Sequence, residues 1–134
     1  MKDRCVPDTV WLNHLSSIIL DSAITVHKEM GPGLLENVYQ HCMVKELHRR
    51  ELNVSMMVAV PLYYKGDPLK KDYFIDILVE NEIILELKSI EGLLAIHEAQ
   101  IISYLKLANK HLGLLVNFNV LLLKQGFRRY VNNF

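Results

Sequence analysis

Residues 73–90 read YFIDILVENEIILELKSI, and this stretch decides the architecture of the chain. Two apolar runs alternate here with charged residues and are joined at Glu80-Asn81-Glu82. The pattern predicts two antiparallel strands connected by a tight turn. With the turn centred on Asn81, Asp76 lies opposite Glu86, although a register slip of one residue would loosen that pairing.

Side chains alternate along a strand, so the predicted hairpin has two different faces. Lys88 lies two residues after Glu86 and shares the charged face with it and with Asp76. The opposite face is entirely aliphatic and carries Ile75, Ile77, Val79, Ile83, Leu85 and Leu87. The charged face also holds Phe74, Leu78 and Ile84. These apolar residues indicate that the charged face is covered, where uncompensated charges are costly.

The remaining segments predict further helices and strands. Apolar residues recur at helical spacing over residues 9–30, 34–51 and 94–109. Asp8 or Thr9 caps the first helix, and Gly31-Pro32-Gly33 ends it. Strand-like runs cover residues 54–60, 62–64, 112–118 and 127–131, and residues 65–68 form a turn. This order predicts an α/β architecture with a mixed sheet, in which the link from Lys88 to Leu112 makes a parallel crossover.

Composition indicates one globular domain spanning residues 1–134, because 51% of the residues are hydrophobic and 22% are charged. The net charge of zero argues against a large electrostatic footprint on nucleic acid, unless a basic patch or a metal ion compensates. Cys5 and Cys42 are expected to be free thiols in a reducing compartment. With no apolar signal region and no membrane-spanning run, we expect a cytoplasmic protein without a membrane partner.

Two carboxylates at close range repel each other unless something compensates their charge. The repulsion between Asp76 and Glu86 can be relieved in three ways: the two acids share a proton, pair with Lys88, or hold a hard cation such as Mg²⁺. A cation would lower the pKa of bound water and offset charge on a phosphate, with Lys88 orienting the water or stabilising the transition state. The structural alternative is that a strand ending in Glu-Leu-Lys lies on a solvated sheet face and has no catalytic role.

Several ordered blocks of the chain resemble the GxxExxY protein family, which is placed in the PD-(D/E)XK nuclease superfamily. GLLENVY, residues 33–39, fits the GxxExxY signature, and FIDILVENEIILELKS, IHEAQIISYLKL and LGLLVNFN are similar to later blocks. The resemblance runs from about Ile18 to Val131. It implies a restriction-endonuclease-like core, with a mixed central β-sheet flanked by α-helices. It also implies that Asp76 and Glu86 are the metal-binding pair and Lys88 the motif lysine, with Ile75 replacing the proline of the nominal motif.

Further residues match the superfamily pattern. Glu36 falls where an early helix brings an acidic residue towards the metal, although a first-turn carboxylate is also favoured by the helix dipole alone. Gln100 and Tyr104 match the QxxxY motif of the RecB-like branch, which would contact the site or the DNA. His97 lies on the same helix edge, where a lone histidine is usually a surface or capping residue.

The C-terminal cations Lys124, Arg128 and Arg129 have two interpretations: a patch that contacts phosphate, or charges that protect a solvated edge strand. The resemblance implies a nuclease that uses Mg²⁺, with Mn²⁺ as a substitute, and hydrolyses phosphodiester bonds in nucleic acid, for which DNA is the expected polymer. The alternative is a catalytically silent nuclease-fold module that acts as a subunit of a nucleic-acid-processing complex. A stand-alone structural protein is the third reading. Small size and zero net charge favour a homodimer or a protein partner.

Overall fold

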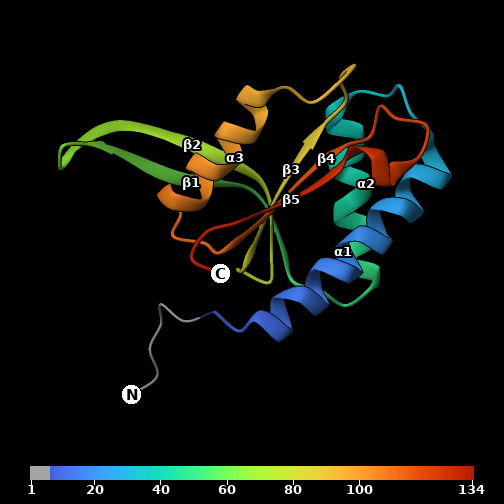
Figure 1. The fold of residues 1–134 in the computed structure, drawn as a ribbon, viewed down its shortest axis with the longest axis horizontal. Coiled ribbons are helices and arrows are strands. Elements are labelled where there is room, and N and C mark those ends of the chain that lie inside the picture. The colour runs from blue at the N-terminus through green and yellow to red at the C-terminus, as the bar shows by residue number, and fades with distance from the viewer. Residues whose placement is uncertain (1–6) are drawn as a thin grey trace.

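A computed structural model of the protein describes residues 7–134 and shows one five-stranded sheet flanked by helices (Figure 1). The elements in chain order are α1 (Thr9–Met30), α2 (Glu36–Arg49), β1 (Val54–Tyr64), β2 (Asp67–Val79), β3 (Ile83–Lys88), α3 (Ala95–Leu107), β4 (Leu112–Asn117), the 3-10 helix η1 (Leu123–Gly126) and β5 (Phe127–Val131). The predicted order of helices and strands is therefore confirmed. Asp8 caps α1 by accepting a hydrogen bond from the backbone N–H of Trp11.

The sheet has the order β1-β2-β3-β4-β5 and is mixed. Strands β3 and β4 are parallel, and every other neighbouring pair is antiparallel. The parallel pair is joined through α3, which confirms the predicted crossover. Pro61 lies within β1, and an edge strand tolerates a proline because one side of it needs no ladder donor.

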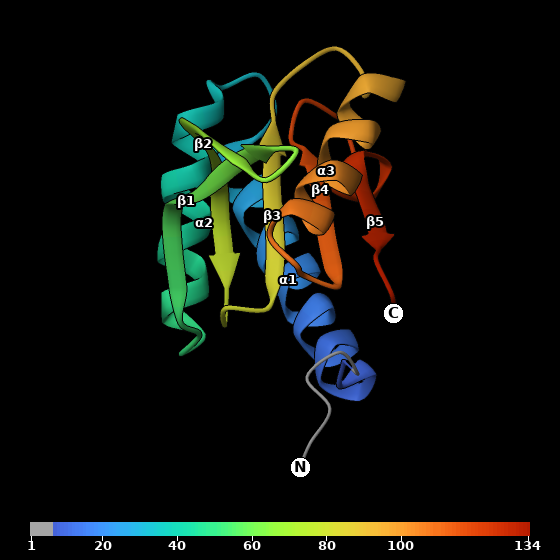
Figure 2. The same cartoon turned by 90° about the vertical axis from the view of Figure 1, so that its left-hand side faces the viewer.

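Helices cover both faces of the sheet (Figure 2). On one face, α1 and α2 bury the larger core cluster, which includes Leu15, Ile19, Tyr39, Met43, Ile77, Leu85, Leu114 and Phe118. On the other face, α3 buries a smaller cluster of Val60, Ile75, Leu78, Ile84 and Leu105. Strand β4 is buried along its whole length, as expected for an apolar strand between two helical layers.

The side-chain alternation of β2 changes at Asp76. Ile77 packs with α1 and α2, whereas Ile75 packs beside Leu78 in the cluster under α3. The prediction that Ile75 and Ile77 share one aliphatic face is therefore wrong. Phe74 is also not covered, since 49% of it is exposed.

The cause is an interruption of the regular pleat on both sides of β2. Its ladder with β3 has the predicted register, but it ends at Ile77 opposite Leu85 and does not include Asp76. On the β1 side, Met57 has a positive φ of 49° and forms no ladder pair. An irregular residue of this kind turns the following side chains to the other face.

Beyond this point β1 and β2 continue as a two-stranded arm, residues 58–75, which projects from the body of the molecule (Figure 1). The sequence predicted that the strand after the turn at residues 65–68 starts near Tyr73. In the structure β2 already begins at Asp67, so the arm was not predicted. Cys42 is a free thiol, while Cys5 lies outside the described residues. Within residues 7–134, every helix is too short or too polar to cross a membrane.

Candidate metal centre

Asp76 and Glu86 meet where β2 leaves β3. The backbone N–H of Asp76 donates to Oε2 of Glu86 at 2.9 Å, and the backbone N–H of Leu87 donates to Oδ2 of Asp76 at 3.0 Å. The two carboxylates thus satisfy N–H groups that the interrupted ladder leaves without a carbonyl partner. The sequence predicted that these residues lie opposite each other. In the structure they lie close together, joined by hydrogen bonds from backbone N–H groups to their carboxylates.

Glu86 is a buried acid, with only 7% of the residue exposed. Burial is the main cause that raises the pKa of Glu86 above its ordinary value, and the neighbouring charge of Asp76 raises it further. The Asp76 N–H and the charge of Lys88 oppose the rise only in part. An ionised pair at this position therefore needs a positive partner, and without one the two acids retain a proton.

Lys88 lies at the end of β3 and is half-buried. In residues 7–134, the ion pairs within 4.0 Å both involve Arg50, so Lys88 is not paired directly with either acid. Its charge nevertheless lowers the pKa of Glu86. Of the three arrangements open for the two acids, direct pairing with Lys88 is not formed, which leaves a shared proton or a bound cation.

Glu36 is the first residue of α2 and is exposed. Partial burial raises the pKa of Glu36; Asp76 raises it further, while Lys88 and His97 lower it, so Glu36 lies within electrostatic range of the site. It stands apart from the acidic pair, however, because the described residues contain no group of three acidic, histidine or cysteine side chains close enough to hold a metal. The pair alone fits Mg²⁺, which usually takes one or two carboxylates and keeps several waters.

Tyr39 explains how the Gly-x-x-Glu-x-x-Tyr motif presents Glu36. Its hydroxyl donates to the carbonyl of Gly31 at 2.5 Å and accepts from the N–H of Leu34 at 3.1 Å. Its buried ring stacks on Phe118 with centroids 4.4 Å apart. The tyrosine therefore fixes the loop from which α2 and Glu36 begin.

The chain that follows Lys88 is also held in place. The buried side chain of Asn117 accepts from the N–H of Ile90 at 3.1 Å and donates to its carbonyl at 2.9 Å. Ser89 donates to the carbonyl of Leu34 in the loop before α2. These bonds tie the end of β3 to β4 and to the Glu36 loop. Sequence reasoning did not find Ser89 or Asn117, since their partners are distant in the chain.

Gln40 is a third residue that the sequence did not single out for the site. Its Nε2 donates to the backbone carbonyl of Asp76 at 3.1 Å. Gln40 is half-buried and lies one turn after Glu36 on the same face of α2. The only local signal was this helical spacing, which is common on helix surfaces.

On α3, Tyr104 is half-buried within electrostatic range of Glu86 and Asp76, and Gln100 is exposed to solvent. Burial is the main cause that raises the pKa of Tyr104, with the charges of Glu86 and Asp76 adding to it. Its ring stacks on Tyr73 at 4.3 Å. His97 caps the helix, accepting from the N–H of Leu94 at 2.9 Å, which matches the structural interpretation of this residue.

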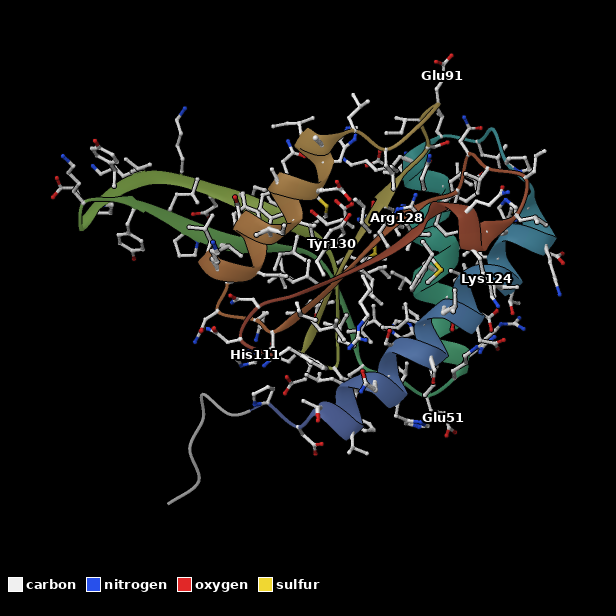
Figure 3. The ribbon with its side chains drawn as sticks, viewed as in Figure 1. Glu51, Glu91, His111, Lys124, Arg128 and Tyr130 are labelled. Atoms are coloured by element: carbon white, nitrogen blue, oxygen red, sulfur yellow. The ribbon has the colours of Figure 1, made fainter. Side chains whose placement is uncertain are left out.

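Arg128 and Arg129 point to opposite faces of β5, as neighbours on a strand must. Arg128, labelled in Figure 3, is in register with Leu115 and through it with Glu86. Tyr130, two residues further along β5, packs against the cluster under α3, so Arg128 lies on the α3 face. Arg129 donates to Oδ1 of Asn13 in α1 at 2.6 Å. The structure therefore brings Arg128, but not Arg129, to the face of the acidic pair.

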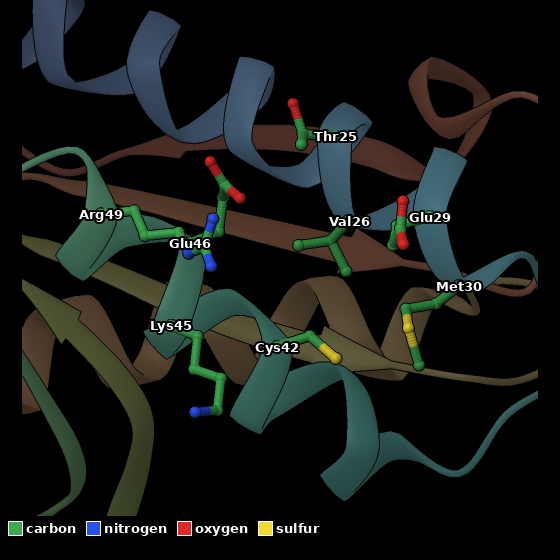
Figure 4. A pocket seen from close by; sticks show the side chains of 8 residues that line it. All are labelled: Thr25, Val26, Glu29, Met30, Cys42, Lys45, Glu46 and Arg49. Carbon is green, nitrogen blue, oxygen red and sulfur yellow. The ribbon is translucent and has the colours of Figure 1, made fainter.

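A groove of about 400 Å³ lies between α1 and α2 on the other side of the sheet (Figure 4). Its lining residues are Thr25, Val26, Glu29, Met30, Cys42, Lys45, Glu46 and Arg49. None of the predicted site residues is among them. The groove is thus separate from the acidic pair.

A mixed sheet flanked by helices carries one buried acid, Glu86, one half-buried acid, Asp76, and a lysine on neighbouring strands, which is an arrangement typical of nuclease-type domains. The family model of the PD-(D/E)XK nuclease superfamily matches residues 13–130. The chain therefore belongs to the PD-(D/E)XK nuclease superfamily and has its restriction-endonuclease-like fold, as predicted. No curated protein and no solved structure matches it. Nucleases of this superfamily typically use divalent metal ions and bind nucleic acid.

Proposed function

We propose that this protein is a Mg²⁺-dependent nuclease of the GxxExxY type that hydrolyses phosphodiester bonds in DNA. The observation that supports this most is the acidic pair itself. Asp76 and Glu86 lie together in a mostly buried position, the pKa of Glu86 is raised, and no lysine or arginine within 4.0 Å neutralises them in the described chain. An uncompensated acidic pair costs stability, and a function that requires a cation accounts for its presence.

Asp76 and Glu86 would hold the ion, and Glu36 would approach it from the start of α2. When bound, the ion lowers the pKa of a coordinated water and offsets charge that develops on the phosphate. Lys88 orients the attacking water or stabilises that charge, and its lack of an ion pair leaves its ammonium free to do so. Mn²⁺, which also prefers oxygen ligands, is the expected substitute.

Residues around the pair would contact the substrate. Tyr104 lies near the acids and offers a hydroxyl, and Gln100 lies one turn before it on α3. Arg128 shares the α3 face of the sheet and supplies a guanidinium suited to bidentate contact with a phosphate. The guanidinium of Arg128 also donates to the backbone carbonyl of Gln125 at 3.0 Å. Arg129 takes no part in this proposal because it lies on the opposite face of β5, where it is bonded to Asn13.

The competing function is a catalytically silent module that retains the fold and borrows nucleic-acid affinity from a partner protein. Its support is the zero net charge of the chain, which provides little overall attraction for a polyanion. Fold and superfamily do not decide between the two, since function depends on the site.

Two measurements test the proposal. Calorimetric titration with Mg²⁺ or Mn²⁺ should give binding in the wild type and in Glu91→Gln, an exposed control, but not in Asp76→Asn or Glu86→Gln. Incubation with single- and double-stranded DNA and RNA should then show metal-dependent cleavage of DNA that Lys88→Ala abolishes. Unchanged metal affinity in both acid variants would refute the site. Metal binding without any cleavage would favour the silent module.

A further inference from the structure

The arm, residues 58–75, exposes aromatic rings and ammonium groups, and the ammonium of Lys65 lies over the ring of Tyr64 at 5.5 Å from its centroid. Tyr63 and Tyr64 are 60% and 62% exposed, and half of Phe74 is in solvent. Three exposed lysines lie among them, Lys65, Lys70 and Lys71. Against these the arm has two acids, Asp67 and Asp72, so it is locally cationic in a chain of zero net charge. Solvent-exposed aromatic rings on a projecting ribbon contribute little to folding.

The arm is anchored directly beside the acidic pair. Its β2 side ends at Ile75, next to Asp76, and its Tyr73 both stacks on Tyr104 and donates to the Tyr104 carbonyl at 3.0 Å. Val60 and Ile75 at its base pack under α3. Figure 2 shows the arm at the end of the molecule where β3 ends and α2 begins. From Asp76 to its tip the arm extends about 30 Å, at roughly 3.3 Å per strand residue.

The geometry of the arm argues against strand pairing with another chain. Pro61 pairs with Asp72 and Tyr63 with Pro68, so three residues of β2 lie opposite Leu62 alone. Within this irregularity Lys70 has a positive φ of 56°. Bulges, prolines and lysines at a sheet edge are features that prevent edge-to-edge pairing. The exposed rings therefore need a partner that contacts side chains and not the backbone.

We propose that the arm binds a single-stranded segment of nucleic acid and guides it to the acidic pair. Tyr63 and Tyr64 are neighbours on β1 and therefore face opposite sides of the arm. The strand would cross the ribbon near its tip, with unpaired bases stacking on Tyr63 on one side and on Tyr64 on the other, while Lys65, Lys70 and Lys71 contact the phosphates between them. Rings interleaved with cations are the usual means of holding single strands, since every base has a stacking face and every nucleotide a charge. This inference rests on the proposed function only for the cleavage of the bound nucleic acid, and not for its binding to the arm.

Anisotropy of a labelled single-stranded oligonucleotide in EDTA tests binding without cleavage. The double variant Tyr63→Ala/Tyr64→Ala should weaken affinity at least about fivefold, whereas Tyr63→Phe/Tyr64→Phe should retain it because the rings remain. Lys70→Ala/Lys71→Ala should flatten the dependence of log Kd on log salt by about 0.7 for each lost contact. Lys28→Ala/Lys45→Ala, which removes exposed lysines from α1 and α2, is the matched control and should change little.

Hydrolysis of bis(p-nitrophenyl) phosphate, which is too small to reach the arm, separates this proposal from the nuclease proposal. The arm variants should hydrolyse it at the wild-type rate. If the wild type hydrolyses nothing while the tyrosine variant still loses oligonucleotide affinity, the arm proposal stands and the nuclease proposal fails. The arm proposal is overturned if the tyrosine-to-alanine variant and the lysine-to-alanine variant both bind the oligonucleotide with wild-type affinity. The proposal is also overturned if the tyrosine-to-alanine variant changes its oligomeric mass while its oligonucleotide binding is unaltered. That result would make the arm a self-association surface.

Discussion

The backbone N–H of Asp76 donates to the carboxylate of Glu86 across the point where β2 and β3 separate. The carboxylate of Asp76 in turn accepts from the N–H that follows Glu86. These acids therefore serve the fold as well as the candidate metal centre. Replacing them with alanine would remove both contributions, so Asp76→Asn and Glu86→Gln are the informative variants: their side chains still offer an acceptor oxygen while the charge is removed.

The metal-free protein should lose stability as the pH rises from about 4.5 to about 8. The pKa of Glu86 is raised from 4.5 to about 8, so the folded protein binds its proton more tightly than the unfolded chain does. This contribution is complete below 4.5 and is lost as the pH passes through the folded pKa. Chemical denaturation in EDTA across this range measures it. Glu86→Gln should flatten the pH dependence; an identical slope in that variant would contradict the assignment.

Divalent ions should stabilise the protein more at pH 8.5 than at pH 6, because metal ligands must be deprotonated. At a free ion concentration 100 times Kd the gain is about 2.7 kcal/mol. Melting curves with Mg²⁺, Mn²⁺ and EDTA at both pH values measure it. Asp76→Asn should melt at the same temperature with and without the ion. A pH-independent gain would place ion binding elsewhere.

Gln40→Ala should weaken metal binding without unfolding the protein. The amide of Gln40 holds the backbone carbonyl of Asp76, and a carbonyl that loses its donor costs about 1–3 kcal/mol if no water replaces it. Calorimetry with Mn²⁺ and denaturation curves measure the two effects. Asn37→Ala, an exposed polar position on the same helix, is the control. Equal metal affinity in the two variants would limit Gln40 to a packing role.

Tyr39→Phe should lower both stability and cleavage, whereas Glu36→Gln should lower cleavage alone. The phenylalanine keeps the stacking on Phe118 but loses both hydrogen bonds to the loop before α2, a loss of about 1–2 kcal/mol. Glu36 is exposed and makes no comparable contact. Denaturation and a cleavage assay on both variants separate loop positioning from stability. Full cleavage activity in Tyr39→Phe would show that Glu36 needs no fixed loop.

Arg128→Ala should weaken binding to DNA, whereas Arg129→Ala should not. Arg128 lies on the face of the acidic pair, and Arg129 is bonded to Asn13 on the other face. Loss of a surface contact of this kind costs Arg129→Ala at most about 1 kcal/mol of stability. Binding titrations at two salt concentrations compare these adjacent cations. Equal losses of affinity would indicate general electrostatic attraction without a defined contact.

Much of the fold follows from local patterns. The turn at Glu80-Asn81-Glu82 and the register of Leu78 with Ile84 were both predicted from alternation over a few residues. The α1 boundaries and the edge strand Phe127–Val131 agree with their predicted ranges. These features depend on near neighbours in the chain, so spacing and capping residues are sufficient to find them.

The details of the candidate site depend on contacts between distant segments. Gln40 reaches Asp76 across 36 residues, and Ser89 reaches Leu34 across 55. No local pattern marks such partners, because any half-buried polar residue on a helix or a loop has the same appearance in the sequence. The same holds for Arg128 and Arg129: alternation separates them, but only sheet packing tells which of them faces the acids.

The sequence was sufficient to predict the order of elements from periodicity, the mixed sheet from the long link between Lys88 and Leu112, and the proximity of Asp76 to Glu86 from one turn. Three-dimensional packing was required for the interruption at Asp76, where β2 loses β3 as a partner, Ile75 turns to α3 and the arm begins. The physical reason is that side chains alternate only while the backbone keeps the regular extended pleat, and that pleat is interrupted where Asp76 leaves the β3 ladder and Met57 leaves the β1 ladder. Where that ladder ends, side chains take over its hydrogen bonds, and here those side chains are the acidic pair.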